Sequence, residues 1–213
     1  MKMNQVYQKI KEMILYGELK PGDFLTVGNL AECFNVSKTP VRDSLNTLKH
    51  EGLIDVLPYK GYMVSRVDAK DLLDLFDMRI ILEGSATEMA TRHANPPAYD
   101  ELMKLAQIEV VESTEESVAV QFQRTNFNFH VAIAKLSGNH YLYDSVCHVL
   151  NHLQRVLYRD LLTGDPVTMS REHIELVQCM KAGNPKNAKE LAVQQIETTK
   201  QRVLGSVLIQ QRP

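Results

Sequence analysis

The stretch VSKTPVRDSLNTLKHEG, residues 36–52, decides the fold of the amino-terminal part of this chain. Apolar residues recur in it at helical spacing and predict a helix with one buried face: Val41, Leu45 and Leu48. Ser37 can act as the N-cap, because its hydroxyl can accept a hydrogen bond from a backbone N–H of the first turn. Pro40 lies in that turn, where a missing N–H costs little, and Gly52 ends the helix.

Polar side chains at the start of this helix indicate a nucleic-acid contact. Lys38, Thr39 and Arg42 project from its amino-terminal end, the part of a recognition helix that meets base edges and phosphates. For this segment alone, an ordinary amphipathic surface helix is the favoured interpretation. The neighbouring segments change that balance, because together with it they predict a winged helix.

Two predicted helices precede this stretch. Residues 6–14 form a first amphipathic helix, and Leu25-Thr26 starts a second one that ends near Asn35. About three residues then separate the second helix from the third, the usual short turn of a helix-turn-helix.

A predicted β-hairpin follows the recognition helix directly, which is the position of a wing. Residues 53–57 and 62–64 are β-rich runs on either side of a turn that begins at Pro58. Lys60 and Gly61 lie at the tip of this turn. A basic side chain and a bare backbone there can approach the minor groove or the phosphates.

The charge of the chain supports DNA binding only locally. The whole chain has a net charge of −2 and a pI of 6.4, so it has no global basic field. Five cations in residues 1–67 are candidate phosphate contacts: Lys38, Arg42, Lys49, Lys60 and Arg66. This footprint is modest, so we expect a homodimer that places two recognition helices about 34 Å apart on double-stranded operator DNA. Its affinity should fall steeply with salt.

The bulk composition, 44% hydrophobic and 23% charged, is ordinary for a soluble globular protein. No apolar run approaches the ~18 residues that span a bilayer, and the amino-terminus does not read as a secretory signal, so no membrane partner is expected. Three widely spaced cysteines favour buried free thiols in the cytoplasm: Cys33, Cys147 and Cys179.

A second, all-helical domain is expected after the wing, which gives domains at 1–67 and 68–213. Asp68 can cap its first helix, and Pro- and Gly-containing breaks separate the later ones. Six amphipathic helices are predicted, at about 68–92, 99–113, 115–136, 141–162, 167–182 and 186–207. The expected fold class is therefore mainly α: an amino-terminal winged helix-turn-helix with a small β-hairpin wing, followed by a six-helix antiparallel bundle.

The amino-terminal pattern resembles that of GntR-family bacterial transcription regulators. The matching residues run from Leu25, Leu30 and Ala31 through VSKTPVRDSL (36–45) and EGL (51–53) to Gly61 and Val64. The resemblance implies that four of them face DNA: Lys38, Thr39, Arg42 and Gly61. With the residues chosen on charge and position, the expected DNA-binding set is Ser37, Lys38, Thr39, Arg42, Lys49, Lys60 and Gly61.

Residues 68–213 resemble the FadR-type ligand-sensing domain of the same family, called FCD. The matches are Arg79 and Glu83, Phe129-His130, Ser137-Gly138-Asn139 and Glu172-His173. Many such domains hold a divalent metal through one Asp and three His. The resemblance places these residues at the four ligand positions: Asn126, His130, His173 and Gln195. Two ligands are thus replaced by neutral amides, which bind Zn²⁺ or Ni²⁺ poorly.

Three interpretations of this second cavity stay open. A divalent metal (Zn or Ni) is held weakly by His130, His173 and Asn126; or these side chains and Gln195 hydrogen-bond an organic effector; or all four are satisfied polar residues of a bundle core.

Arg79 is expected in the bundle interior, on a helix whose other inward residues are apolar. Glu83 at i+4 can neutralise it there. Alternatively, its planar guanidinium can bind the carboxylate of a small effector. The resemblance implies small acidic metabolites as effectors: organic acids, sugar acids or amino acids. His152 is a further cavity candidate, because relatives often place an inward-facing basic residue at that position.

The leading hypothesis is a ligand-responsive, homodimeric transcription regulator, with repression as the commoner arrangement in the family. The alternative is a metal-dependent enzyme or metal sensor that uses the cavity of His130 and His173. Against an enzyme, the sequence contains no acid–base pair, nucleophile elbow or phosphate-binding Gly loop. A third hypothesis, a helical interaction protein whose winged helix has lost DNA affinity, has only Gly28 in its favour.

Overall fold

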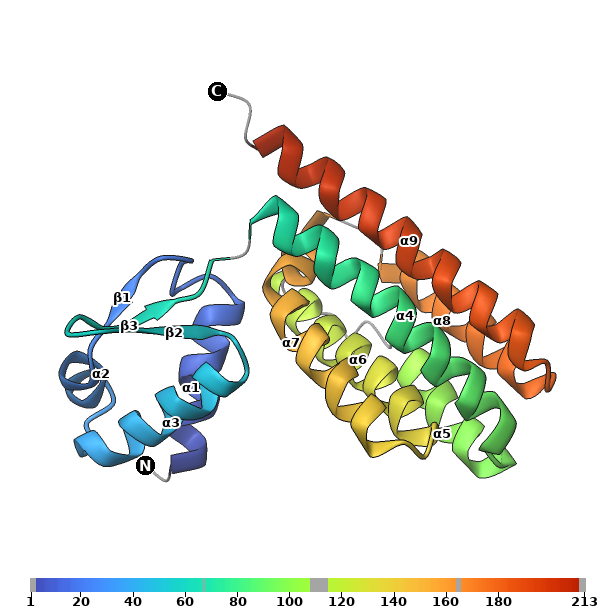
Figure 1. Cartoon of the computed structure of the whole chain (residues 1–213), viewed down its shortest axis with the longest axis horizontal. Helices are drawn as coiled ribbons and strands as arrows, with labels where there is room; N and C mark the ends of the chain where they lie inside the picture. Colours follow the sequence, from blue (N-terminus) through green and yellow to red (C-terminus); the bar gives the residue numbers. More distant parts are fainter. Residues whose placement is uncertain (1–2, 67, 108–114, 164–165, 211–213) are drawn as a thin grey trace. The chain divides into compact units, whose positions relative to one another are not determined.

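The computed structural model describes residues 3–66, 68–107, 115–163 and 166–210 (Figure 1). The chain divides into two compact units, Met1–Asp68 and Ala69–Pro213. The first is a winged helix-turn-helix and the second a helical bundle, so the predicted fold class is confirmed.

The first unit packs three helices and a small sheet around one apolar core. Its elements are α1 (Met3–Leu15), β1 (Phe24–Leu25), α2 (Val27–Cys33), α3 (Lys38–His50), β2 (Ile54–Leu57) and β3 (Gly61–Val64). α1 lies against α3. Their apolar stripes meet in the core through Val6, Ile10, Ile14, Val41, Leu45 and Leu48, all at most 1% exposed. The helical spacing of the apolar residues between positions 41 and 48 therefore predicted the buried face of α3 correctly.

The caps of α2 and α3 differ from the prediction. Ser37 lies at the N-cap of α3 with extended backbone, but its side chain makes no capping hydrogen bond. Thr26 is the residue that caps with its side chain, because its Oγ1 accepts from the backbone N–H of Asn29 at 3.1 Å. Leu25 belongs to a strand and not to the start of α2. Asn35 follows α2 with a φ of 51°, which agrees with a helix end at that point.

The sheet has three antiparallel strands in the order β1-β3-β2. The predicted hairpin is confirmed as β2 and β3, with Leu57 opposite Gly61. The third strand, β1, was missed, since two residues are too short to show a period. Gly61 has a φ of 100°, and a Cβ there would lie 3.1 Å from the carbonyl oxygen of Leu25. Only glycine fits this close approach without strain.

The second unit is a bundle of six helices: α4 (Ala69–His93), α5 (Pro96–Ala106), α6 (Glu115–Leu136), α7 (His140–Thr163), α8 (Pro166–Lys181) and α9 (Pro185–Gln210). Five of the predicted spans agree with these bounds to within about three residues. The second span was predicted to reach Ser113, but α5 ends at Ala106 and Gln107 is extended. Residues 108–114 lie outside the described residues.

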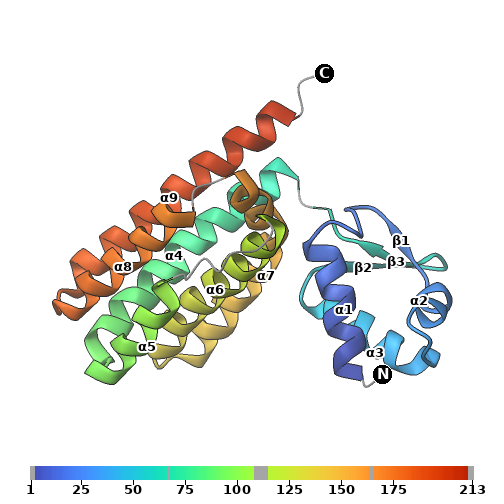
Figure 2. The ribbon, with the colours of Figure 1, turned by 180° about the vertical axis from the view of Figure 1, so that it is seen from behind.

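α4 is the central helix of the bundle, and it runs antiparallel beside α9 in both views (Figures 1 and 2). Gly84 permits this approach, because a Cβ there would come within 3.0 Å of the Val193 side chain. α6 and α7 pack on the other side of α4. The bundle core contains large, fully buried side chains such as Phe76, Phe122 and Phe129.

Two further expectations concern surface properties. Cys33 is exposed, and Cys147 and Cys179 are only partly buried, so the prediction of three buried thiols was wrong. Over the described residues, none of the helices combines the length and the apolar character needed to cross a bilayer.

Candidate functional site

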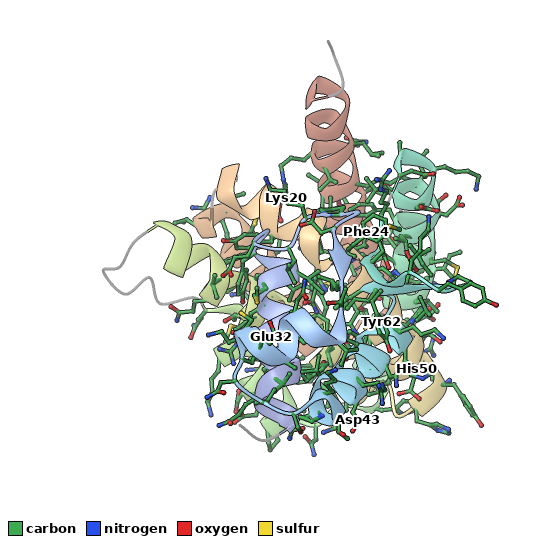
Figure 3. The ribbon with its side chains drawn as sticks, turned by 90° about the vertical axis from the view of Figure 1, so that its left-hand side faces the viewer. Lys20, Phe24, Glu32, Asp43, His50 and Tyr62 are labelled. Carbon is green, nitrogen blue, oxygen red and sulfur yellow. The ribbon has the colours of Figure 1, made fainter. Side chains whose placement is uncertain are left out.

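The start of α3 offers a polar, accessible surface. Lys38, Thr39 and Arg42 are exposed, whereas Val41 and Leu45 on the same helix are fully buried (Figure 3, in which Asp43 and His50 label this helix). Ser37 and Lys49 are also exposed. The helical period therefore presents the predicted contact residues to solvent and turns the apolar residues inwards.

The wing tip carries an aromatic side chain that the sequence reasoning did not single out. The backbone N–H of Lys60 donates to the carbonyl of Leu57 at 3.1 Å, so residues 57–60 form a β-turn. Pro58 takes its second position and Tyr59 its third, with a φ of 63°. That position of a type II turn normally favours glycine. Tyr59 is fully exposed, so its ring adds nothing to the core. The signal that could have revealed it is an aromatic residue at a turn position that requires positive φ.

A polar network fixes the far end of α3 against α1. Lys11 Nζ lies 2.8 Å from Glu51 Oε2, and the Tyr7 hydroxyl donates to Glu51 Oε1. Burial, together with the hydrogen bond and charge of Glu51, raises the pKa of Tyr7 well above 10. The side chains of Lys11 and Glu51 are partly buried. This network therefore orients α3 relative to α1.

The second unit contains a cavity between α4, α6, α7, α8 and α9. The described residues that line it include five of the six predicted effector residues: Arg79, Asn126, His130, His173 and Gln195. Residues that were not predicted as effector contacts also line it, notably Glu172, Thr199 and Arg202. The space open to the centres of water molecules is about 40 Å³. One ordered water needs roughly 10–15 Å³ of such space, so the cavity has room for about three.

Buried charges lie at one side of this cavity. Glu83 accepts from Arg79 Nε at 2.5 Å and pairs with His130 Nδ1 at 2.6 Å. Arg79 Nη2 lies 3.0 Å from His130 Nε2. Since a guanidinium only donates, Nε2 must accept and the ring proton must be on Nδ1, which donates to Glu83. Burial alone would raise the pKa of Glu83, but Arg79 and His130 hold it well below its usual range. The i+4 pairing of Arg79 with Glu83 was foreseen, and the contact with His130 was not.

His173 lies deep in the same lining with an unused ring nitrogen. Its ring stacks on Phe129 at 4.1 Å between centroids and meets His130 edge-on at 5.1 Å. It is 6% exposed, and its Nδ1 has no hydrogen-bond partner among the residues that the structure describes. Burial, and then the neighbouring His130 and Arg79, hold the pKa of His173 well below 6.5, so the ring is neutral at pH 7. A buried nitrogen without a partner is costly, which points to a ligand or water in the cavity.

The remaining polar lining residues are half-buried. Gln195 Nε2 donates to the backbone carbonyl of Glu172 at 2.7 Å, which ties α9 to α8. Burial raises the pKa of Glu172, and the charge of Glu175 adds to this while Arg202 opposes it. His152 is not among the lining residues; it is partly buried on α7, with its ring 4.6 Å from that of His148.

Two protein-family models match this chain and identify its family. The model for bacterial regulatory proteins of the gntR family matches residues 2–64, and the FCD domain model matches residues 74–198. The chain belongs to the GntR family. It is a transcription regulator with an FCD domain, and the enzyme alternative falls, because the family and the named relatives are regulators.

Individual relatives match most of this GntR-family chain in sequence, and one solved structure matches its fold. The transcriptional regulator YdhC of Bacillus subtilis strain 168 is 31% identical over 195 residues, which cover 87% of this chain and 84% of YdhC. McbR of Escherichia coli K12 is 29% identical over 67% of this chain and 72% of McbR. The solved structure of E. coli McbR/YncC superposes with a TM-score of 0.73 at 23% identity, covering 98% of this chain and 97% of that one.

The residues of this FCD domain do not fit the divalent metal that the resemblance implied. Asn126 and Gln195 supply amides, and the lone pair of His130 Nε2 is taken by Arg79. A cation bound there would also face the guanidinium at short range. Within the described ranges, no three His, Cys, Asp or Glu side chains are grouped as a metal site requires. His173 is left as the one imidazole in the lining with an unused nitrogen.

Proposed function

We propose that this GntR-family regulator is a homodimeric repressor whose operator affinity is controlled by a small organic acid in the FCD cavity. The DNA-binding half of the proposal depends on one observation, the exposed start of α3 above a fully buried opposite face. We propose that the protein represses transcription and does not activate it. A relative from E. coli K12, 29% identical over 64% of this chain and 63% of its own length, is named the transcriptional repressor GlaR.

In this proposal α3 enters the major groove of the operator. Arg42 and Lys38 hydrogen-bond base edges or phosphates, and Thr39 contacts bases beside them. Lys49 and the wing residues Lys60 and Gly61 contact the backbone. Five cations per protomer are few, so two protomers on a two-fold operator are needed for tight binding.

The regulatory half of the proposal depends on the polar cavity of the FCD domain. Arg79 presents a guanidinium that can bind a carboxylate, and His173 presents a buried nitrogen without a partner. An effector that binds better in one arrangement of the dimer shifts the population towards it. By linkage, bound operator DNA then lowers the affinity of the protein for the effector by the same factor by which the bound effector lowers its affinity for the operator.

A mobility-shift titration with the protein's own upstream promoter tests the DNA-binding half. Arg42→Ala should weaken promoter binding by about 1–3 kcal/mol per protomer, the value of a good base contact, with unchanged circular dichroism. Lys9→Ala is the matched control, because it removes the same charge from an exposed position on α1. Equal promoter affinity for wild type and Arg42→Ala would refute the docking proposed for α3.

A thermal-shift screen of small carboxylates tests the regulatory half. A ligand that binds only the folded protein raises the melting temperature, and those that do should also weaken promoter binding. The screen is run with and without added Zn²⁺ or Ni²⁺. Stabilisation that requires the metal would contradict the metal-free cavity, and stabilisation without any effect on promoter binding would contradict the regulatory role.

A further inference from the structure

Glu172 brings an unpaired negative charge into the cavity wall. Its backbone carbonyl accepts from Gln195, but its carboxylate makes no hydrogen bond or ion pair with any described residue. Arg202 lies in the same lining and its charge lowers the pKa of Glu172, but the two side chains make no direct ion pair. A half-buried carboxylate without a partner is unfavourable unless something binds it.

The cation of Arg79 is already balanced. Glu83 neutralises it within the protein, and its Nε and Nη2 are engaged by Glu83 and His130. Nη1 makes no hydrogen bond to the described residues, and Arg79 lines the cavity, so Nη1 is the donor that a ligand carboxylate can reach. A simple carboxylate bound there would add a net negative charge to a lining in which Glu83 balances Arg79 and the charge of Arg202 offsets that of Glu172.

Two neutral amide side chains in the same lining as Glu172 suit an ammonium group. Asn126 and Gln195 both line the cavity, and Asn126 has no hydrogen-bond partner among the described residues. Each amide has one acceptor oxygen, and a primary ammonium has three donors. Two amides and a carboxylate thus offer three acceptor groups to an ammonium. A metal site at the same positions would need a further imidazole and a further negative charge.

We propose that the effector is a small zwitterion, an α-amino acid whose carboxylate binds Arg79 and whose ammonium binds Glu172. This inference rests on the proposed effector role of the cavity and narrows it from organic acids in general. The zwitterion adds no net charge to the interior and gives the carboxylate of Glu172 a direct ion pair. Space for about three waters favours the smaller amino acids.

Isothermal titration of the full-length protein with matched pairs of ligands tests this proposal. Each pair differs only in hydroxyl for ammonium: glycine and glycolate, L-alanine and L-lactate, L-serine and L-glycerate, L-aspartate and L-malate. At least one amino acid should bind tenfold or more tightly than its hydroxy acid. Tighter binding by the hydroxy acids would overturn the zwitterion while leaving the organic-acid effector intact. Absence of binding by every member of the set would overturn both.

Variants of α8 assign the preference to a residue. Glu172→Gln should reduce the preference for the amino acid to threefold or less without weakening the hydroxy acid. Glu175→Gln is the matched control, since it removes an exposed carboxylate from the same helix outside the lining. Because Glu172→Gln removes an unpaired charge, it should fold at least as stably as wild type; Glu172→Ala provides a second variant. A preference that persists in both Glu172 variants would overturn the assignment.

Discussion

Glu83 holds together the interior charges of the FCD domain, because it pairs with both Arg79 and His130. Breaking a buried ion pair leaves an uncompensated charge, which costs about 3–5 kcal/mol. We predict that Glu83→Gln lowers the free energy of unfolding by about 3 kcal/mol in urea denaturation. Glu88→Gln is the control on the same helix, since Glu88 pairs with Arg92 and Lys189 near the surface. Equal losses in both variants would show that burial does not decide the contribution of these pairs.

Tyr59 carries backbone strain at the wing tip without any compensation in the core. An L-residue with positive φ costs roughly 1 kcal/mol, and asparagine tolerates that conformation better. We predict that Tyr59→Asn keeps or slightly raises the melting temperature of the protein and weakens operator binding, because the exposed ring lies next to Lys60 and Gly61, where the proposed contact of the wing with DNA is made. Thermal denaturation and a mobility shift with the same preparation check both parts. Lower stability with unchanged operator affinity would mean that the ring serves the fold.

The sequence predicted part of the cavity for identifiable reasons. Asn126 and His130 are one turn apart, so helical geometry alone puts them on one face, and the structure lines the cavity with both. The contact between Arg79 and His130 joins residues 51 positions apart. No local pattern encodes such a distance, because it depends on how α4 packs against α6. Glu172 was recognised only as a family match and not as a cavity contact, since its half-buried position in the lining is a property of the folded neighbourhood.

Among the secondary-structure elements, helix boundaries were predictable where a proline or a glycine marks them in the sequence. α5, α8 and α9 each begin at a proline, and a glycine follows α6 and α8 closely. β1 was not predictable, because it exists only through pairing of Phe24 and Leu25 with β3. The end of α5 was overestimated for a similar reason, since the apolar period continues in sequence beyond the helix.

The two helix caps of the helix-turn-helix give a matched stability test. Thr26 accepts from the N–H of Asn29, whereas Ser37 makes no capping bond with its side chain. Removal of a capping side chain costs about 1 kcal/mol. We predict that Thr26→Ala lowers the free energy of unfolding by about that amount and that Ser37→Ala has a clearly smaller effect. Chemical denaturation of the two variants distinguishes them. A larger loss in Ser37→Ala would contradict the cap geometry described above.

At the scale of the whole molecule, the cavity chemistry predicts regulation without a metal. Prolonged dialysis against EDTA should leave both operator affinity and the effector response unchanged, because amides and an occupied His130 hold divalent ions poorly. Elemental analysis of the purified protein, with a zinc protein as a positive control, accompanies the titration. Stoichiometric zinc or nickel, with an effector response lost on its removal, would contradict this prediction.

In the proposed regulator, two copies of α3 and its wing read a two-fold symmetric DNA sequence. Selection of binding sites from a random duplex library by the full-length protein, followed by sequencing, tests this symmetry. We predict a pseudo-palindrome whose half-sites lie about one helical turn apart, roughly 34 Å, and its disappearance with Arg42→Ala. Enrichment of no sequence by the wild-type protein, or the same enriched sequence with Arg42→Ala, would contradict it.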